Sequence, residues 1–198
     1  MVKAPIYGLV LTGGKSTRMK KDKAALKFHG KPQAQHVFEL LTPYCDKVFI
    51  SSRKEQAPTY KKYPQVHDLK KFSGKGPLSG ILSAMAKYPQ AAWLVLACDL
   101  PFVDEKTLEH LLRYRDPKKI ATAYRSRFND LPEPLCAIWE PKAQKRLLSF
   151  RKRGIHCPRK ILINSNPRLL KLKNKKALDN INTPEEYKEA VNYFRKQH

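Results

Sequence analysis

The stretch from Leu9 to Lys23, LVLTGGKSTRMKKDK, contains the residue types that hold phosphate groups. The adjacent glycines Gly13 and Gly14 let backbone N–H groups approach an anion without a Cβ atom in the way. Arg18 and Lys23 add the planar fork and the point charge that polyphosphates attract. GGKST does not complete an ATPase phosphate loop, because that loop needs a glycine five residues before Gly14, where Leu9 stands. The alternatives are an anion cradle of another kind and an ordinary strand-to-helix turn with surface cations.

A second candidate for chemistry is Asp99. It follows the apolar run AWLVLA almost directly, and Pro101 stiffens the turn after it. A carboxylate at the end of a buried strand suits Mg²⁺ that bridges nucleotide phosphates. The alternative is an aspartate that caps the next helix.

The elements that would position these residues can be read from the hydrophobic pattern. Continuous apolar runs at 6–11, 47–51 and 92–97 predict strands buried on both faces. Helical spacing follows at 32–43, 76–88 and 104–114, and TPEE at 183–186 is a capping box that opens a last helix. Alternating strands and helices predict an α/β fold with a mostly parallel sheet. The loops after Leu11, Ser51 and Ala97 should then share one crevice at the carboxyl ends of the strands.

The net charge of +23 indicates a surface that attracts anions, and residues 141–178 contain no Asp or Glu. The sequence has no zinc-finger spacing, RNP motif or aromatic-interleaved basic stretch, so we expect nucleic acid only as a non-specific electrostatic partner. A solvated lysine face is the alternative to a specific anion site.

Location and assembly are less constrained. No apolar run approaches the ~20 residues of a membrane span, and the N-terminus has no signal-peptide pattern, so we expect a cytoplasmic protein with no membrane partner. The four cysteines form no CxxC pair, which disfavours a disulfide framework or a zinc site. We expect a monomer.

The stretch LTGGKSTRMKKDKAAL resembles the signature of the sugar-phosphate-type nucleotidyltransferases, and most closely that of the molybdenum cofactor guanylyltransferases, the MobA family. Five further segments resemble motifs of that family in the same order along the chain, namely HGKPQAQHV, GKGPLSGILSAM, WLVLACDLPFV, LPEPLCAIW and NINTPEE. The resemblance implies a Rossmann-like three-layer αβα sandwich and a single MobA-like nucleotidyltransferase domain over residues 1–198.

The function implied by this resemblance is Mg²⁺-dependent transfer of GMP from GTP to molybdopterin, with release of pyrophosphate, in molybdenum cofactor biosynthesis. The attacking phosphate oxygen is already anionic, so positioning and charge neutralisation can replace a general base. The implied partners are GTP and molybdopterin or the molybdenum cofactor, and other cofactor-biosynthesis proteins fit the same setting.

The resemblance also implies roles for individual residues. Arg18, Lys23 and Asp99 would be catalytic, and Asp99 would hold the Mg²⁺. Asn180 and Asn182 would lie on the acceptor side, and the basic segment 142–176 near the pterin phosphate. The implied nucleotide-binding residues are Leu11, Thr12, Gly13, Gly14, Lys23, Ser52, Asp68, Gly76, Pro77, Gly80 and Asp99.

The sequence departs from the family pattern at three positions. Thr12 replaces an alanine, Lys20 replaces the glycine of RMG, and Ser52 stands where an asparagine often follows the second strand. Lys20 could weaken turnover, and Ser52 leaves the base preference open. The alternatives are a CTP:molybdopterin cytidylyltransferase, a sugar-phosphate-type nucleotidyltransferase, and a basic non-catalytic relative that binds nucleotides or nucleic acid.

Overall fold

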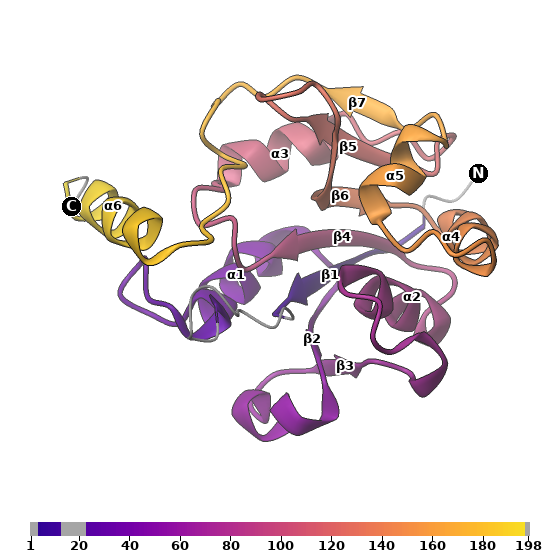
Figure 1. The fold of residues 1–198 in the computed structure, drawn as a ribbon, viewed down its shortest axis with the longest axis horizontal. Coiled ribbons are helices and arrows are strands. Elements are labelled where there is room, and N and C mark those ends of the chain that lie inside the picture. The colour runs from indigo at the N-terminus through magenta and orange to yellow at the C-terminus, as the bar shows by residue number, and fades with distance from the viewer. Residues whose placement is uncertain (1–3, 13–22, 197–198) are drawn as a thin grey trace.

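The computed structural model describes residues 4–12 and 23–196. Within these residues the strands form one seven-stranded sheet with the order β3-β2-β1-β4-β6-β5-β7 (Figure 1). The strands are β1 (Ile6–Leu11), β2 (Lys47–Ser52), β3 (Gln65–His67), β4 (Ala92–Ala97), β5 (Ala121–Arg125), β6 (Pro132–Trp139) and β7 (Arg168–Leu170). Neighbouring strands are parallel except around β6, which runs antiparallel to both β4 and β5. The predicted α/β fold with a mostly parallel sheet is confirmed.

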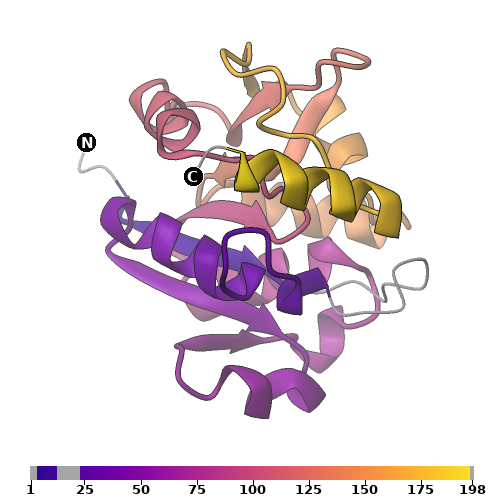
Figure 2. The same ribbon diagram turned by 90° about the vertical axis from the view of Figure 1, so that its left-hand side faces the viewer.

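Helices cover both faces of the sheet and complete the predicted Rossmann-like three-layer αβα sandwich. They are α1 (Gln33–Leu41), α2 (Pro77–Lys87), α3 (Glu105–Arg113), α4 (Ala143–Lys152), α5 (Pro158–Ile163) and α6 (Pro184–Arg195). Short 3-10 helices are η1 (Lys23–Ala25), η2 (Thr42–Tyr44), η3 (Lys54–Tyr60) and η4 (Lys70–Phe72). α1 packs on β1 and β2, whereas α2 packs with α4, and α4 with α5, on the other face (Figures 1 and 2). α6 lies outside the layers, at the end toward which β1 and β4 point (Figure 1).

The core explains why the apolar runs form strands. All of β4 is buried, and β1 is buried from Gly8 onward. Trp93 of β4 and Trp139 of β6 are fully buried and lie opposite each other in the sheet. Burial on both faces is what a continuous apolar strand requires.

The predicted helix starts are also confirmed. Asp104 caps α3, with its Oδ1 accepting from the Thr107 N–H at 2.8 Å. Thr183 and Glu186 form a capping box at α6, in which the Glu186 N–H donates to Thr183 Oγ1 at 3.2 Å and Glu186 Oε2 accepts from the Thr183 N–H at 3.1 Å. These caps satisfy N–H groups that the first turn of a helix leaves unpaired.

A second, smaller hydrophobic cluster attaches α6 to the rest of the molecule. It contains buried Leu26, Phe28, Ile181 and Ala190, against which aromatic residues of α6 pack. Leu26 and Phe28 follow the glycine-rich stretch, and Ile181 precedes α6. The cluster therefore joins two segments that are far apart in sequence near the ends of the strands.

Candidate active site

The carboxyl ends of β1, β2 and β4 lie side by side, as the sequence predicts. Leu11 of β1 is in register with Ser51 of β2 and with Ala97 of β4. Beyond the paired residues, the Cys98 N–H donates to the Leu11 carbonyl at 3.1 Å. The chain leaving β4 therefore stays beside the end of β1, and Asp99 follows one residue later.

Thr12 joins the end of β1 to the end of β2. Its side chain is buried, and its Oγ1 donates to the Ser51 carbonyl at 2.7 Å. The hydroxyl is thus used inside the sheet, which explains how the position accepts threonine where the family pattern has alanine. A ligand at this edge would meet the backbone of Thr12 rather than its hydroxyl.

Part of the predicted phosphate cradle is outside the described residues. Gly13, Gly14, Arg18 and Lys20 fall in the segment 13–22, and Lys23 begins η1. Their roles in binding the triphosphate stay predictions.

Asp99 lies in the turn after β4 and is half-buried. Its backbone carbonyl accepts a hydrogen bond from the Ile181 N–H at 3.0 Å. This bond brings Asn180 and Asn182 next to Asp99, although they are more than eighty residues away in sequence. The Asn182 N–H in turn donates to Glu186 Oε2 at 2.6 Å, which fixes the segment to the start of α6.

The donor set around Asp99 fits a magnesium ion. The Asp99 carboxylate is a hard oxygen ligand of the kind that Mg²⁺ prefers, Asn180 and Asn182 flank the residue bonded to its backbone, and Mg²⁺ commonly takes its remaining ligands from substrate phosphates and water. The described residues contain no group of three or more His, Cys, Asp or Glu side chains that could hold a metal by themselves. A metal at Asp99 would therefore depend on the nucleotide for part of its coordination.

The loop before α2 is shaped by two glycines with different tasks. Gly76 has φ 59° and ψ −142°, a backbone region that is essentially restricted to glycine. Gly80 is buried, and a Cβ atom placed on it would lie 2.4 Å from Ser51 Oγ and 3.0 Å from Leu11 Cδ2. Gly76 thus permits the turn into Pro77 and α2, and Gly80 lets α2 pack closely on β1 and β2. Their predicted contact with a nucleotide base stays a prediction.

Ser52 is held within the sheet edge formed with β3. It is buried, its Oγ donates to Gln65 Oε1 at 2.8 Å, and the same Oγ lies 3.1 Å from His67 Nδ1. Gln65 is a site-adjacent residue that the sequence did not single out. With its hydroxyl engaged in this way, Ser52 would present mainly its backbone to a nucleotide.

Asp68 follows β3 on the same edge, and its N–H donates to the Ser52 carbonyl at 3.4 Å. Burial raises the pKa of its carboxyl group, while the charges of Arg53 and His67 act in the opposite direction. The side chain is half-buried. Its predicted role on the base side of the site stays a prediction.

A cavity of about 590 Å³ opens beside the Asn180 to Asn182 segment. It is lined by residues of the turn between β5 and β6, of the segment 176–182 and of α6, and by Phe102, Glu133 of β6 and Arg159 of α5. Among the residues of the turn, the segment and α6 are Arg127, Phe128, Lys176, Asp179 and Tyr193. A second cavity of about 320 Å³ shares Glu133, Arg159 and Asn180 with it and reaches Pro77 at the start of α2. Together the two cavities reach from Pro77 at the start of α2 to α6.

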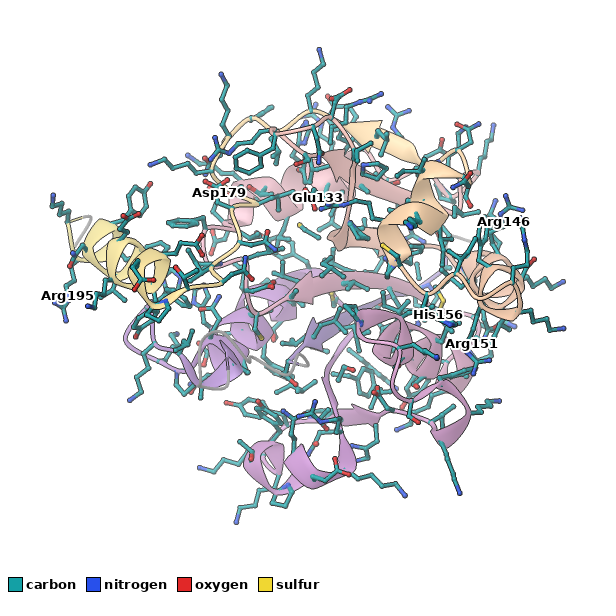
Figure 3. The ribbon with its side chains drawn as sticks, viewed as in Figure 1. Glu133, Arg146, Arg151, His156, Asp179 and Arg195 are labelled. Atoms are coloured by element: carbon teal, nitrogen blue, oxygen red, sulfur yellow. The ribbon has the colours of Figure 1, made fainter. Side chains whose placement is uncertain are left out.

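The sequence did not reveal two ion pairs that line the larger cavity. Arg127 donates from Nε and Nη2 to the two carboxylate oxygens of Asp179 at 2.7 and 2.8 Å. Arg159 Nη2 donates to Glu133 Oε2 at 2.5 Å. Figure 3 shows Asp179 and Glu133 on the same side of the molecule, between α6 and α5. Each pair joins residues at least 26 positions apart, so no local pattern could have indicated it.

The arginines and lysines of the basic segment 142–176 do not all lie near the larger cavity. Arg159 and Lys176 line the larger cavity. Arg146 and Arg151 of α4 lie on the far side from α6 (Figure 3), where Arg146 bonds to Ser165 Oγ at 3.1 Å and Arg151 to the Lys71 carbonyl. Only part of the segment is therefore placed to meet a ligand near Asp99.

Comparison with known proteins decides the family. Residues 8–169 match the family model described as MobA-like NTP transferase domain. The chain belongs to this family. As a member, it is a nucleotidyltransferase, and the resemblance based on the motifs is confirmed.

Relatives of this MobA-like chain cover most of its length. A molybdenum cofactor biosynthesis bifunctional protein of Synechocystis sp. is 40% identical over 92% of the chain, and the chain spans 53% of that protein, about half its length. A probable molybdenum cofactor guanylyltransferase of Bacillus cereus (strain ATCC 10987 / NRS 248) is 27% identical, with 92% of this chain and 94% of the relative covered. The crystal structure of molybdopterin-guanine dinucleotide biosynthesis protein A from Archaeoglobus fulgidus superposes with a TM-score of 0.80 at 26% identity, covering 96% of this chain and 99% of that one.

The family match ends before the last motif. Asn180 and Asn182 lie beyond residue 169, so their place in the site of this MobA-like chain depends on the hydrogen bond between Ile181 and Asp99. No helix among the described residues is long and apolar enough to cross a membrane.

Proposed function

We propose that this chain transfers GMP from GTP to molybdopterin and releases pyrophosphate, as a step of molybdenum cofactor biosynthesis. The observation that carries the proposal is the hydrogen bond from the Ile181 N–H to the Asp99 carbonyl at 3.0 Å. It joins the strand ends, where a nucleotide would lie, to the wall of the cavity of about 590 Å³. The names of the Bacillus and Archaeoglobus relatives support this reaction.

The chemistry would need orientation more than proton transfer. An anionic oxygen of the acceptor's phosphate monoester attacks the α-phosphorus of GTP, a new P–O bond forms, and the bond to the β-phosphate oxygen breaks with its electron pair leaving on pyrophosphate. Asp99 would hold the Mg²⁺, which neutralises charge on the phosphates. Arg18 and Lys23 would stabilise the pyrophosphate as it leaves. Asn180 and Asn182 would orient the acceptor phosphate beside Asp99.

The residues on the proposed base-binding side of the site favour guanine over the other bases. Asp68 is a half-buried carboxylate beside Ser52, at the edge formed by β2 and β3. An ionised carboxylate only accepts hydrogen bonds, and guanine presents two adjacent N–H groups on its pairing edge. Ser52, whose hydroxyl is used by Gln65 and His67, leaves Asp68 as the polar side chain that would read the base. A CTP-dependent enzyme of the same fold is the rival, because the family's asparagine is missing at Ser52.

We further propose that residues 1–198 act as one nucleotidyltransferase domain, as a monomer in the cytoplasm, alongside other proteins of cofactor biosynthesis. The single sheet that contains all seven strands of the described residues supports the first point. Non-specific binding of nucleic acid to the surface of charge +23 would weaken steeply with salt.

A thermal-shift panel tests the proposal. The melting temperature is measured with GTP, CTP, ATP and UTP, with and without Mg²⁺, for the wild type, for Asp99→Asn and for the matched control Glu109→Gln, an exposed carboxylate on α3. A ligand that binds the native state raises its melting temperature by mass action. We expect a Mg²⁺-dependent shift with GTP that Asp99→Asn loses and Glu109→Gln keeps, followed by GTP-dependent turnover of molybdopterin. A shift with CTP alone would indicate that the chain transfers CMP and not GMP. No shift with any nucleotide would refute a catalytic role.

A further inference from the structure

The larger cavity is flanked by two aromatic rings that each have a cation beside them. Phe128, in the turn between β5 and β6, is 70% exposed, and the Arg127 guanidinium lies 4.1 Å from its ring centroid. Tyr193 of α6 is 36% exposed, and Lys176 Nζ lies 5.2 Å from its ring centroid. All four residues line the cavity. Large exposed apolar rings at the edge of a cavity are a feature of binding sites.

The Arg127 side chain is held in one place. Both carboxylate oxygens of Asp179 accept from it, at 2.7 and 2.8 Å, and this bidentate bond raises the pKa of the arginine further above its already high ordinary value. The guanidinium that lies over the Phe128 ring is therefore positioned before any ligand arrives. A fixed stack of this kind costs less conformational entropy on binding than a mobile side chain would.

The wall of the cavity is also bonded to the turn that carries Asp99. Asn180, Ile181 and Asn182 belong to its wall, and the Ile181 N–H is bonded to the Asp99 carbonyl. In the same wall Arg127 is paired with Asp179 and Arg159 with Glu133. Lys176 adds a positive charge there, and Glu186 and Glu189 add negative charge. A ligand with a flat apolar body therefore finds the Phe128 and Tyr193 rings in this cavity, and its polar end would meet the amide-bearing Asn180 and Asn182.

From these contacts we propose that Phe128, backed by Arg127, is the platform on which the fused heterocyclic ring of the acceptor stacks. Tyr193 forms a second wall for the ring, and the phosphate monoester of the acceptor points toward Asn180 and Asp99. This rests on the proposed function for the identity of the acceptor as a pterin phosphate. In this role Phe128 determines acceptor specificity and makes no contact with the nucleotide. Asp179 is a positioning residue that acts through Arg127.

The experiment compares acceptor binding with nucleotide binding in the full chain. The variants are Phe128→Ala, the conservative Phe128→Tyr, and the control Tyr114→Ala. Tyr114 is a matched control because it is 41% exposed, has the Arg113 guanidinium 5.9 Å from its ring centroid, and is not among the residues that line the cavity. Neopterin monophosphate serves as the probe, since stacking on an aromatic ring quenches its fluorescence. GTP with Mg²⁺ is measured in parallel by thermal shift.

We expect Phe128→Ala to weaken binding of the probe, and to raise the KM for molybdopterin, by about tenfold, the typical effect of losing one stacked ring. Phe128→Tyr and Tyr114→Ala should bind like the wild type, and the GTP shift should be the same in all four proteins. Asp179→Asn should also raise the KM for the acceptor while leaving the KM for GTP unchanged, which a general loss of structure would not do.

Equal binding of the probe by wild type and Phe128→Ala, or no binding by the wild type, would overturn the inference even if GTP-dependent transfer proceeds normally. Phe128-dependent binding of the probe in a protein that shows no nucleotide shift would instead support the stacking platform and overturn guanylyl transfer. The two proposals can therefore fail separately.

Discussion

Replacing Gly80 by alanine should push α2 away from the ends of β1 and β2, where the proposed nucleotide would lie. The new Cβ atom would lie 2.4 Å from Ser51 Oγ, 3.0 Å from Leu11 Cδ2 and 3.3 Å from Ser51 Cβ. The first distance is far inside van der Waals contact, and Ser51 and Leu11 belong to buried strands that cannot easily retreat. Alanine in a helix would by itself be favourable by about 1 kcal/mol relative to glycine.

The net effect follows from these two opposing contributions. Inserting a methyl group into a well-packed core costs about 1–3 kcal/mol, and a contact this short belongs at the upper end. After the gain in helix propensity, Gly80→Ala should destabilise the protein by about 2 kcal/mol. In a chain of this size that corresponds to a fall of about 4–8 °C in melting temperature. The KM for GTP should also rise, because α2 begins at the expected base side of the site.

The assay is urea unfolding of four proteins: wild type, Gly80→Ala, Ser51→Ala and the double variant. Ser51→Ala removes the oxygen at 2.4 Å but leaves the contacts at 3.0 and 3.3 Å, so the double variant should recover about half of the lost stability. A Gly80→Ala protein as stable as the wild type would show that α2 is not packed as closely as described. Purely additive effects would show that Ser51 Oγ is not the obstacle.

Two further predictions concern side chains away from the site. Glu140→Gln should destabilise the protein by about 3–5 kcal/mol in urea unfolding, because it breaks a buried bidentate ion pair with Arg115, whose side chain is 2% exposed and that of Glu140 1%. An unchanged unfolding midpoint would contradict the buried pair. The double variant Arg115→Met with Glu140→Leu should recover much of the lost stability. His36 has its pKa lowered to about 4, mainly by burial and then by the charges of His29 and Lys31. The unfolded chain therefore binds a proton that the folded chain excludes, so stability should fall by roughly 1–2 kcal/mol as the pH drops from about 6.5 to about 4. His36→Phe should remove this pH dependence, and an identical pH profile in both proteins would refute it.

The sequence predicts the elements whose burial is uniform or whose ends carry a cap. β1 and β4 are buried along most of their length and appear as continuous apolar runs, and Asp104 and Thr183 start helices with the caps that their side chains form. It does not predict that β6 inserts antiparallel between β4 and β5, because strand order is decided by long-range packing. α4 and α5 were also hidden, since their many cations obscure the few buried positions that hold them.

The site divides in the same way. Asp99 and Thr12 could be anticipated because they directly follow strands whose ends must meet at one edge. Arg127 and Asp179 could not, because their bond connects residues 52 positions apart and neither lies in a recognisable motif. Phe128 carries a signal in retrospect, as a large apolar residue at the tip of a polar turn between two strands.

Ile181 connects the proposed nucleotide side of the site with the proposed acceptor side. The motif NIN draws attention to its two asparagines, yet the residue between them makes the connection. Its side chain is buried in the small cluster with Leu26, Phe28 and Ala190, and its N–H is bonded to the Asp99 carbonyl. Leu26 and Phe28 follow directly on the segment that contains the predicted phosphate cradle. A shift of α6 would therefore move Ile181 and, through it, disturb both Asp99 and the chain that follows the predicted cradle. If the proposed function holds, this cluster would fix the two substrates relative to each other.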